Sequence, residues 1–564
     1  MKKQSLDQGI GRAPGMLVSL LLVAACGRSE SVAVPAGAGD DLEIALAQLG
    51  GARSQEPERV VPAPRLIAPL SGSLAGAARP EFRWTGPRVA VVEVCADRAC
   101  VRPLSAFLAF GQTARPPRAL GRGVVFWRLL SLGPDLSIQA TAAWELFVPA
   151  GAGAAAATRG LRYDADGDGF VDAAVRAQNA PAATDVVHVF AGGAPGVDPA
   201  RDTILTLDVT RFGVGLSAAG DMNGDGFGDL AVADGRGVVV YAGSAAGPVA
   251  APLAVIPPPA DANVFGFGFQ LSGTGDVNGD GYADLAVADG SAQVWVFLGG
   301  AAGPSSTPGW VLDRRNTANR FVRLLTAGNF NGDGFDDLVL TDYGPDGTPQ
   351  GFRYFRGGAA GLEAPAAGTF VERPAFPTGS SGDVDGDGIS DLVTAEGATL
   401  AIFRGGPAFP SQAPLQVVAI AARPGPLQLG DFNGDGAFDL AATTSTPSPD
   451  SFYFTDDRLD IYPGSPEGLA ATPAQTLIEA AVLPDNQLNF GLSLGAGDFN
   501  RDGRDDLLVG APPPFPTPFF DTSASAVFVF AGAAGGVSTT PSARADGTPG
   551  FGLRVTAGAP QSGP

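Results

Sequence analysis

The chain has 564 residues, of which 45% are hydrophobic and only 17% are charged, with 80 glycines and 48 prolines. This length is enough for two or three domains, and this composition is typical of many short strands joined by tight turns. The formal net charge of −22 disfavours nucleic acid or an anionic membrane surface as a direct partner and favours cations. One histidine and three cysteines leave little for acid–base, nucleophilic or zinc chemistry.

Residues 1–25 predict a signal peptide. Lys2 and Lys3 give a basic start, and the apolar run over 16–25 is much shorter than the roughly 20 residues that cross a bilayer. The run 23–26 (VAAC) resembles the bacterial lipobox, in which the cysteine is acylated on its thiol and becomes the mature N-terminus. The resemblance implies lipidation of Cys26; the alternative is an ordinary signal peptide with an incidental cysteine. Valine stands where that motif more often has leucine.

The predicted location is the cell envelope, at the outer membrane or cell surface of a bacterium. Gly27 follows the cysteine, whereas an aspartate there would resemble a signal for retention at the inner membrane. Residues 26–60 have no sustained hydrophobic period and predict a flexible tether.

Residues 61–150 predict a small β domain. Apolar runs at 89–94, 124–129 and 144–148 are separated by glycine and proline at the spacing of a sandwich. The order of these strands resembles a fibronectin type III or immunoglobulin-like module, for which we expect a spacer role. With Cys26 lipidated, Cys95 and Cys100 remain, and they can form a disulfide in an exported protein. A zinc site would need more ligands nearby.

A nine-residue motif, D-x-[DN]-G-D-G-x-x-D, recurs through the rest of the chain. It begins at residues 164, 221, 276, 329, 383, 431 and 498. A period near 50 residues indicates a propeller or a solenoid.

The chemistry of the motif predicts calcium. Calcium takes six to eight oxygen ligands. Side chains at positions 1, 3, 5 and 9 and the backbone carbonyl at position 7 can converge if glycine at positions 4 and 6 permits a tight turn. The predicted ligands of the seven loops are Asp164, Asp166, Asp168, Phe170 and Asp172; Asp221, Asn223, Asp225, Phe227 and Asp229; Asp276, Asn278, Asp280, Tyr282 and Asp284; Asn329, Asn331, Asp333, Phe335 and Asp337; Asp383, Asp385, Asp387, Ile389 and Asp391; Asp431, Asn433, Asp435, Ala437 and Asp439; and Asp498, Asn500, Asp502, Arg504 and Asp506.

The motif has two other interpretations. The loops could be Asx-turns that need no metal. An EF-hand would need glutamate at position 12 and flanking helices, but Val232 and Val287 stand at that position in the second and third loops, within runs that predict buried strands. The motif therefore predicts calcium in β-hairpin loops.

Phe-Gly precedes three of the loops, at 212–213, 267–268 and 490–491, and Gly-Ala-Pro follows the last, at 510–512. Together with the nonapeptide, these residues resemble FG-GAP repeats, the units of the integrin α-subunit propeller and of many bacterial surface proteins. The resemblance covers 151–564 and implies four antiparallel strands per blade, with calcium between the first two. Asn329 at position 1 and Arg501 at position 4 depart from the motif, which predicts weaker sites in the fourth and seventh loops.

The predicted fold is therefore all-β: a seven-bladed calcium-binding β-propeller with up to seven calcium sites, preceded by a small β-sandwich. Eight blades is the alternative. The segment 551–558 looks like a repeat start without a loop after it, so we expect it to supply a strand that closes the ring. Closure leaves few free strand edges.

The predicted function is a non-catalytic, monomeric surface or adhesion module that binds a protein or glycan. Segments 443–459 and 512–520 are candidate binding loops, the alternative being ordinary exposed loops. One rival is a propeller-based polysaccharide lyase or hydrolase; the only histidine, His188, lies within a predicted strand, and no nucleophile elbow is evident. A second rival is a purely structural envelope component.

Overall fold

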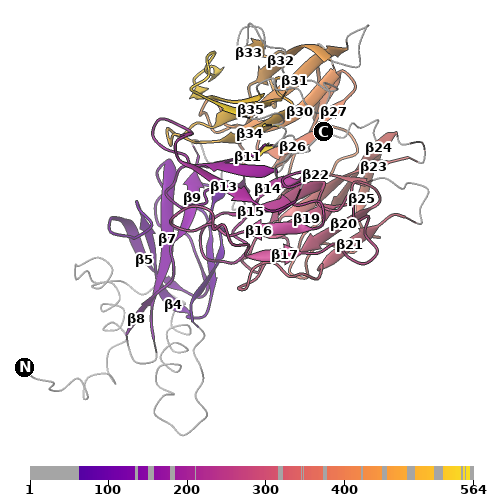
Figure 1. Ribbon diagram of the computed structural model, residues 1–564. Coiled ribbons are helices and arrows are strands. Elements are labelled where there is room, and N and C mark those ends of the chain that lie inside the picture. Colours follow the sequence, from indigo (N-terminus) through magenta and orange to yellow (C-terminus); the bar gives the residue numbers. More distant parts are fainter. Residues whose placement is uncertain are drawn as a thin grey trace, which may run out of the picture. The chain divides into compact units, whose positions relative to one another are not determined.

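The computed structural model describes residues 63–133, 137–149, 158–177, 185–209, 211–315, 322–344, 346, 348–372, 378–420, 423–447, 454–478, 489–512, 525–547, 551–552 and 554–558 (Figure 1). Every regular element in these ranges is a β-strand, and none is a helix. The all-β prediction is confirmed. The predicted signal peptide, the tether and Cys26 lie outside the described residues. No helix in the described ranges is long and apolar enough to cross a membrane.

The chain divides into two compact units. Among the described residues, the first unit contains those within 63–69, 79–120 and 124–146, and the second contains those within 70–78, 121–123 and from 147 onward. The predicted boundary at 150 lies close to this division, but two short segments on its N-terminal side belong to the second unit.

The first unit has two antiparallel sheets. Phe82 and Trp127, one from each sheet, lie 4.5 Å apart between ring centroids, and Trp144 meets Trp127 edge-on at 6.2 Å. These buried rings fill the space between the sheets. One sheet consists of β1 (Arg65–Ala68), β3 (Phe82–Thr85) and β6 (Thr113–Ala114); the other contains β9 (Trp144–Val148), β7 (Gly123–Leu132), β4 (Val89–Cys95) and β5 (Pro103–Phe110), with β8 (Ile138–Ala140) beside β7.

The second unit is a β-propeller. Its described residues form seven four-stranded antiparallel sheets, which we number as blades in chain order (Figure 1). From the inner to the outer strand, the sheets are β40 (Val555–Thr556), β11 (Ala173–Ala177), β12 (Val186–Phe190) and β13 (Asp202–Thr206); β14 (Leu216–Gly220), β15 (Asp229–Ala233), β16 (Val238–Tyr241) and β17 (Ala254–Ile256); β18 (Gln270–Gly275), β19 (Asp284–Ala288), β20 (Gln293–Phe297) and β21 (Trp310–Asp313); β22 (Val322–Gly328), β23 (Asp337–Tyr343), β24 (Pro349–Phe355) and β25 (Thr369–Glu372); β26 (Gly379–Gly382), β27 (Asp391–Glu396), β28 (Thr399–Phe403) and β29 (Gln416–Ala419); β30 (Arg423–Gly430), β31 (Asp439–Pro447), β32 (Phe454–Tyr462) and β33 (Gln475–Ile478); and β34 (Ser493–Gly497), β35 (Asp506–Ala511), β36 (Ser525–Phe530) and β39 (Ala543–Gly547).

Two small pairings complete this unit. Strand β2 (Ser73–Ala75) pairs with β10 (Thr158–Leu161), and β37 (Gly532–Ala533) pairs with β38 (Gly536–Val537).

The blades close into a ring. The inner strands β14, β18, β22, β26, β30 and β34 each contact the next, and β40 contacts both β34 and β14. Strand β40 comes from the C-terminal end of the chain yet pairs with β11 of the first blade, with Val555 opposite Val175. The segment predicted to close the ring therefore does so, although only two of its residues form a strand.

The Phe-Gly pairs have a packing role. Phe212 packs edge-on against Tyr241 of its own blade at 6.1 Å, and Phe267 packs against Phe297 at 6.3 Å. The glycine that follows has a left-handed φ of +81° at Gly213, which a residue with a Cβ would adopt only with strain. In the first blade, Phe551 from the C-terminal segment lies 6.3 Å from Phe190 in the same edge-on way. No Phe-Gly pair lies shortly before the first loop in the sequence, and Phe551 and Gly552 take that place in the first blade.

The core lies between neighbouring blades. Strands β15 and β19 have the same sequence, DLAVA, and all five residues of each are buried. A strand covered on both faces is expected to be a continuous apolar run rather than an alternating one. The first two blades, for example, share a cluster that contains Val187, Leu205, Leu230 and Val239.

Candidate metal centres

The acidic loops occupy equivalent places in the blades. In blades two to seven, each loop connects the inner strand to the second strand, and the aspartate at position 9 is the first residue of that second strand. The first loop precedes β11, and its inner-strand partner is β40. The sequence predicted calcium between the first two strands of each blade, and the loops lie there.

The carboxylate at position 1 holds the turn together. In the first loop, Asp164 Oδ1 accepts a hydrogen bond from the backbone N–H of Gly167 at 2.6 Å, and Oδ2 accepts one from Gly169 at 2.8 Å. Asp221 in the second loop makes the same two bonds, both at 2.7 Å. The glycines at positions 4 and 6 thus serve the turn as predicted.

Positions 3 and 5 form successive Asx-turns. In the second loop, Asn223 Oδ1 accepts the N–H of Asp225 at 2.8 Å, and Asp225 Oδ1 accepts the N–H of Phe227 at 3.0 Å. The resulting curl brings acidic side chains together: one carboxylate oxygen from each of positions 1, 3 and 9 lies within 4.8 Å of the others in the first and fifth loops. These two loops have aspartate at position 3, where the other five have asparagine.

The aspartate at position 9 ties each loop to its blade. In all seven loops of the described chain, its Oδ1 accepts the N–H of a glycine just beyond the third strand, at 2.7–3.1 Å. Its Oδ2 accepts the N–H of position 2, as in Asp284 with Val277 at 2.9 Å, or in the sixth loop that of position 3. A carboxylate oxygen has two lone pairs, so in the first, second, third and fifth loops these bonds leave room for a cation, whereas in the other three loops one oxygen accepts a second hydrogen bond.

Burial and crowding raise the pKa of these carboxyls. Burial, followed by the nearby carboxylates, raises the pKa of Asp229, Asp284 and Asp391 well above the usual range. The same causes raise the pKa of Asp431 and Asp498 to about 7. A proton or a bound cation on such a group therefore stabilises the folded loop.

An arginine offsets the extra charge in each of the two loops with four carboxylates. Arg201 Nη2 lies 2.9 Å from Asp166 Oδ2, and Arg404 Nε lies 2.5 Å from Asp385 Oδ2. Arg404 also approaches Asp387 at 3.5 Å. Sequence reasoning missed both arginines, although aspartate at position 3 was a signal that these loops carry excess charge.

The seven loops are joined in a closed ring of backbone hydrogen bonds. The N–H at position 8 of each loop donates to the position 1 carbonyl of the preceding loop, at 2.7–3.3 Å. Among the described residues, the donor and acceptor pairs are Gly228 and Asp164, Ala283 and Asp221, Asp336 and Asp276, Ser390 and Asn329, Phe438 and Asp383, Asp505 and Asp431, and Val171 and Asp498. Each loop is therefore hydrogen-bonded through its backbone to both of its neighbours.

Two aspartates at position 8 reinforce this ring. Asp336 Oδ2 accepts the N–H of Asp276 at 2.9 Å, and Asp505 Oδ2 accepts that of Asp431 at 2.9 Å. Asp505 also forms a buried ion pair with Arg162, with 2.6 Å between Oδ2 and Nη2. The sequence signal was the Asp-Asp pair at positions 8 and 9 of the fourth and seventh loops.

The two departures from the motif differ in structure. Asn329 keeps one of the turn bonds, accepting the N–H of Gly332 at 2.8 Å, but it brings no charge. Arg501 adopts φ +59°, the left-handed conformation that glycine has at the same position elsewhere. The weaker cation binding predicted for these loops stays a prediction.

Other predicted residues lie away from the loops. His188 lies in β12, with Nδ1 2.7 Å from Asp202 Oδ2 and its ring stacked on Phe190. The predicted binding segment 443–459 is largely a β-hairpin, because Thr443 pairs with Leu459 across β31 and β32; residues 448–453 lie outside the described ranges. Of the segment 512–520, only Pro512 is described.

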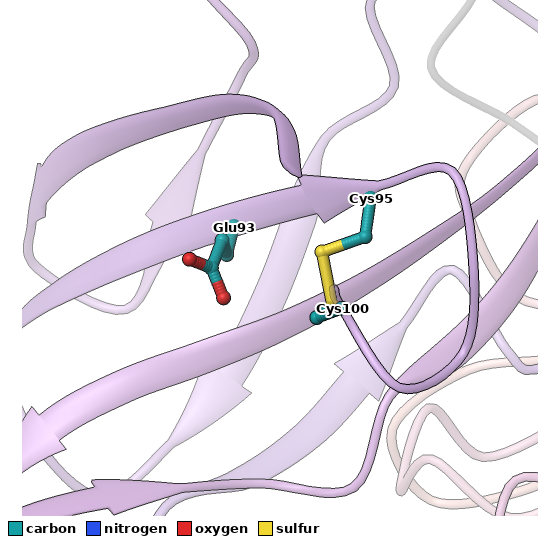
Figure 2. Close-up of side chains that lie close together, drawn as sticks. All are labelled: Glu93, Cys95 and Cys100. Carbon is teal, nitrogen blue, oxygen red and sulfur yellow. A yellow bond between two sulfur atoms is a disulfide. The ribbon is translucent and has the colours of Figure 1, made fainter. Parts of the chain in front are cut away.

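Cys95 and Cys100 are joined by a disulfide in the first unit. Figure 2 shows the bond at the end of β4, with Glu93 on the same strand. Glu93 accepts a hydrogen bond from Arg128 Nε at 2.7 Å. With both sulfurs bonded to each other, this group of residues is a crosslink rather than a metal centre.

Comparison with known proteins identifies the repeats. The family model of the FG-GAP repeat matches residues 490–530, and that of the FG-GAP-like repeat matches 276–340 and 383–442. The chain therefore contains FG-GAP repeats in these segments. The predicted resemblance is confirmed; the lipoprotein assignment stays a prediction.

Integrin α chains are among its relatives. This chain is 38% identical over 160 residues to integrin alpha-PS2 of Drosophila melanogaster, a match covering 24% of this chain and 11% of that protein. It is 41% identical over 96 residues to integrin alpha-7 of Homo sapiens, covering 16% of this chain and 8% of that protein. The match therefore spans about a tenth of the length of these relatives.

Proposed function

We propose that this FG-GAP protein is an exported, lipid-anchored β-propeller that binds calcium in its acidic loops and serves the cell envelope as a non-catalytic binding module. Its partner is a protein or a glycan, and it acts as a monomer. The seven four-stranded sheets of the described residues would be its complete set of blades.

The observation that carries the proposal is the convergence of buried carboxylates in equivalent loops. Asp383, Asp385 and Asp391 offer oxygens within 4.8 Å of one another, and side-chain exposure is low at all three. The donors are all oxygen, which suits a hard cation, and a set of carboxylates with a backbone carbonyl suits the six to eight ligands of calcium.

The charge balance supports the same conclusion. Positions 1, 3, 5 and 9 hold four carboxylates in two loops, three in four loops and two in one, so the seven loops carry 22. These charges repel one another at one end of the propeller. A divalent cation in each loop would neutralise much of that charge, and it would stabilise the folded chain because the unfolded chain has no preformed site.

The binding role is supported by the fold and the relatives. A closed propeller presents loops at both ends of its blades, and such loops accept sequence changes without loss of the core. Integrin α chains share the repeats.

Calcium binding to the full-length protein in detergent micelles tests the proposal. We expect isothermal titration to detect several sites and the melting temperature to fall when a chelator removes the metal. The variant Asp280→Asn keeps the Asx-turn acceptor of the third loop but removes a position 5 charge, so it should abolish or weaken about one site.

Asp289→Asn is the matched control. Asp289 lies in the same blade, just beyond the other end of β19, where its Oδ1 accepts backbone N–H groups of Ser291, Ala292 and Gln293 at 2.9–3.1 Å. It should leave the number of bound calcium ions unchanged. Equal losses in both variants, or a wild-type protein that neither binds calcium nor responds to chelator, would contradict the proposal and favour Asx-turns without metal.

A further inference from the structure

Three arginines lie at the end of the propeller opposite the acidic loops. Arg554 immediately precedes β40, and Arg323 is the second residue of β22. Both are therefore at the starting ends of inner strands, and β22 then runs toward its acidic loop. Arg176 lies on β11, where its backbone N–H donates to the Arg554 carbonyl at 3.0 Å. The group is thus close to the propeller axis.

Two of these guanidinium groups have no carboxylate partner among the described residues. Arg554 Nε donates to the Val214 carbonyl at 3.4 Å, and its guanidinium carbon lies 5.6 Å from the ring centre of Phe269. Arg323 lies over the ring of Tyr343 at 5.9 Å. Only Arg176 is paired, with Asp185 at 2.9 Å. The chain has 58 acidic residues and 36 lysines and arginines, so a shortage of anions does not explain this arrangement.

The electrostatics around Arg554 favour an anion. Burial, followed by repulsion from Arg176 and then Arg323, lowers the pKa of Arg554 to about 10. A carboxylate placed among the three groups would offset both effects. Guanidinium groups suit such a ligand because their planar N–H donors match the two oxygens of a carboxylate.

An exposed aromatic ring adjoins Arg554, and a second exposed phenylalanine lies four residues earlier in the chain. Phe269, which contacts Arg554, is 38% exposed, and Phe265 is 81% exposed. Hydrogen bonds hold the segment that carries them: Gly266 N–H donates to the Asn263 carbonyl at 3.0 Å, and Arg211 Nη1 donates to the Phe265 carbonyl at 3.3 Å. A fixed, exposed phenylalanine beside arginines resembles the centre of a protein interface, where aromatic residues and arginine are enriched.

The geometry points to a carboxylate-binding site formed by Arg176, Arg323 and Arg554, with Phe265 and Phe269 as its apolar rim, that takes an acidic segment of a partner protein. The segment would place Asp or Glu against the guanidinium groups and an adjacent apolar side chain on the rings. The apolar rim favours such a segment over an acidic polysaccharide, because phenylalanine offers no hydrogen bonds to sugar hydroxyls. This inference rests on the proposed binding function and names its ligand class.

Fluorescence anisotropy of a labelled peptide tests the site. The probe is an octapeptide of glycine and serine around a Glu-Leu-Glu core, added to the calcium-loaded full-length protein in detergent. We expect saturable binding that weakens at least about tenfold in Arg554→Gln and in Arg323→Gln, and that weakens with added salt. A Gln-Leu-Gln peptide should not bind, and a Glu-Gly-Glu peptide should bind less tightly.

Arg544→Gln is the charge-matched control. Arg544 lies on the outer strand β39, paired with Asp546 at 2.6 Å, and its loss should not change peptide binding. Melting curves and calcium titration of each variant show whether the fold is kept; if Arg554→Gln does not fold, Arg323→Gln still decides.

Three outcomes would overturn the inference while leaving the calcium proposal intact. These are no peptide binding by calcium-loaded protein, peptide binding that both arginine substitutions leave unchanged, and arginine-dependent binding of an oligogalacturonate but not of the peptide.

Discussion

Asp505→Asn should destabilise the propeller strongly because it leaves Arg162 buried without a countercharge. The Arg162 and Asp505 side chains are only 4% and 7% exposed, and their ion pair measures 2.6 Å. Breaking a buried ion pair by removing one partner costs about 3–5 kcal/mol. For a unit of ~400 residues, with an unfolding entropy of about 2.1 cal/mol/K per residue, this corresponds to a fall in melting temperature of about 4–6 °C.

Asp336→Asn is the matched control. Asp336 is also at position 8, and it makes the same bond to the preceding loop at 2.9 Å. Burial and the nearby carboxylates raise its pKa to about 8, and no arginine or lysine of the described residues pairs with it, so asparagine leaves no buried cation without a countercharge. We expect a cost of about 1 kcal/mol or less, that is, about 1 °C.

Thermal unfolding followed by circular dichroism, at saturating calcium, measures the difference between the two variants. Arg162→Met combined with Asp505→Asn should melt higher than Asp505→Asn alone, because the unpaired cation is then gone. Equal shifts in melting temperature in Asp505→Asn and Asp336→Asn would refute the reasoning. So would a double variant whose loss equals the sum of the losses in Arg162→Met alone and Asp505→Asn alone.

Three further predictions concern the acidic loops. Arg501→Gly should stabilise the protein by about 1 kcal/mol, since Arg501 has a left-handed φ of +59°; an unchanged or lower melting temperature would contradict this. Metal-free protein should melt at a higher temperature at pH 5 than at pH 8. The pKa of Asp431 is raised to about 7 in the folded state, from an unfolded value near 3.9. The stability that its protonated carboxyl contributes is therefore lost as pH rises through the folded-state pKa. A melting temperature independent of pH in chelator would argue against buried, crowded carboxylates. Arg404→Gln should tighten calcium binding in the fifth loop by about 1.5- to 5-fold, a modest change because the arginine is half-exposed. Arg458→Gln is the control in the same titration, because its partner Asp460 lies outside the loops. Weaker calcium binding in Arg404→Gln would show that the arginine supports the site instead of competing with the cation.

The loops could be predicted closely because their geometry is local. Asp221 binds the N–H groups of residues three and five positions later, and glycine at those positions supplies the required turn. The strand that follows, beginning at Asp229, is marked by an apolar run of its own. The nine residues therefore contain both the turn and the backbone N–H groups that stabilise it. Because each repeat has its own copy of the motif, the number of repeats could be counted directly.

The contacts that hold the loops in place could not be predicted in the same way. The glycines that bond to position 9 come 14 to 26 residues later in the chain, across a hairpin whose length varies. Arg201 and Arg404 reach their loops only because the blade folds back on itself. Segment 443–459 is a further example: its polar composition suggests a loop, yet pairing between β31 and β32 extends the hairpin into it.

The sequence by itself determined the repeat, the turn chemistry of each acidic loop and the apolar strands beside it, since these depend on residues within a few positions of one another. The tertiary structure decided which segments meet around the ring. It joined Arg162 to Asp505, and it gathered Arg176, Arg323 and Arg554 at the end opposite the loops. These residues are separated by more than a hundred positions, and only the closing of the blades brings them within reach of each other.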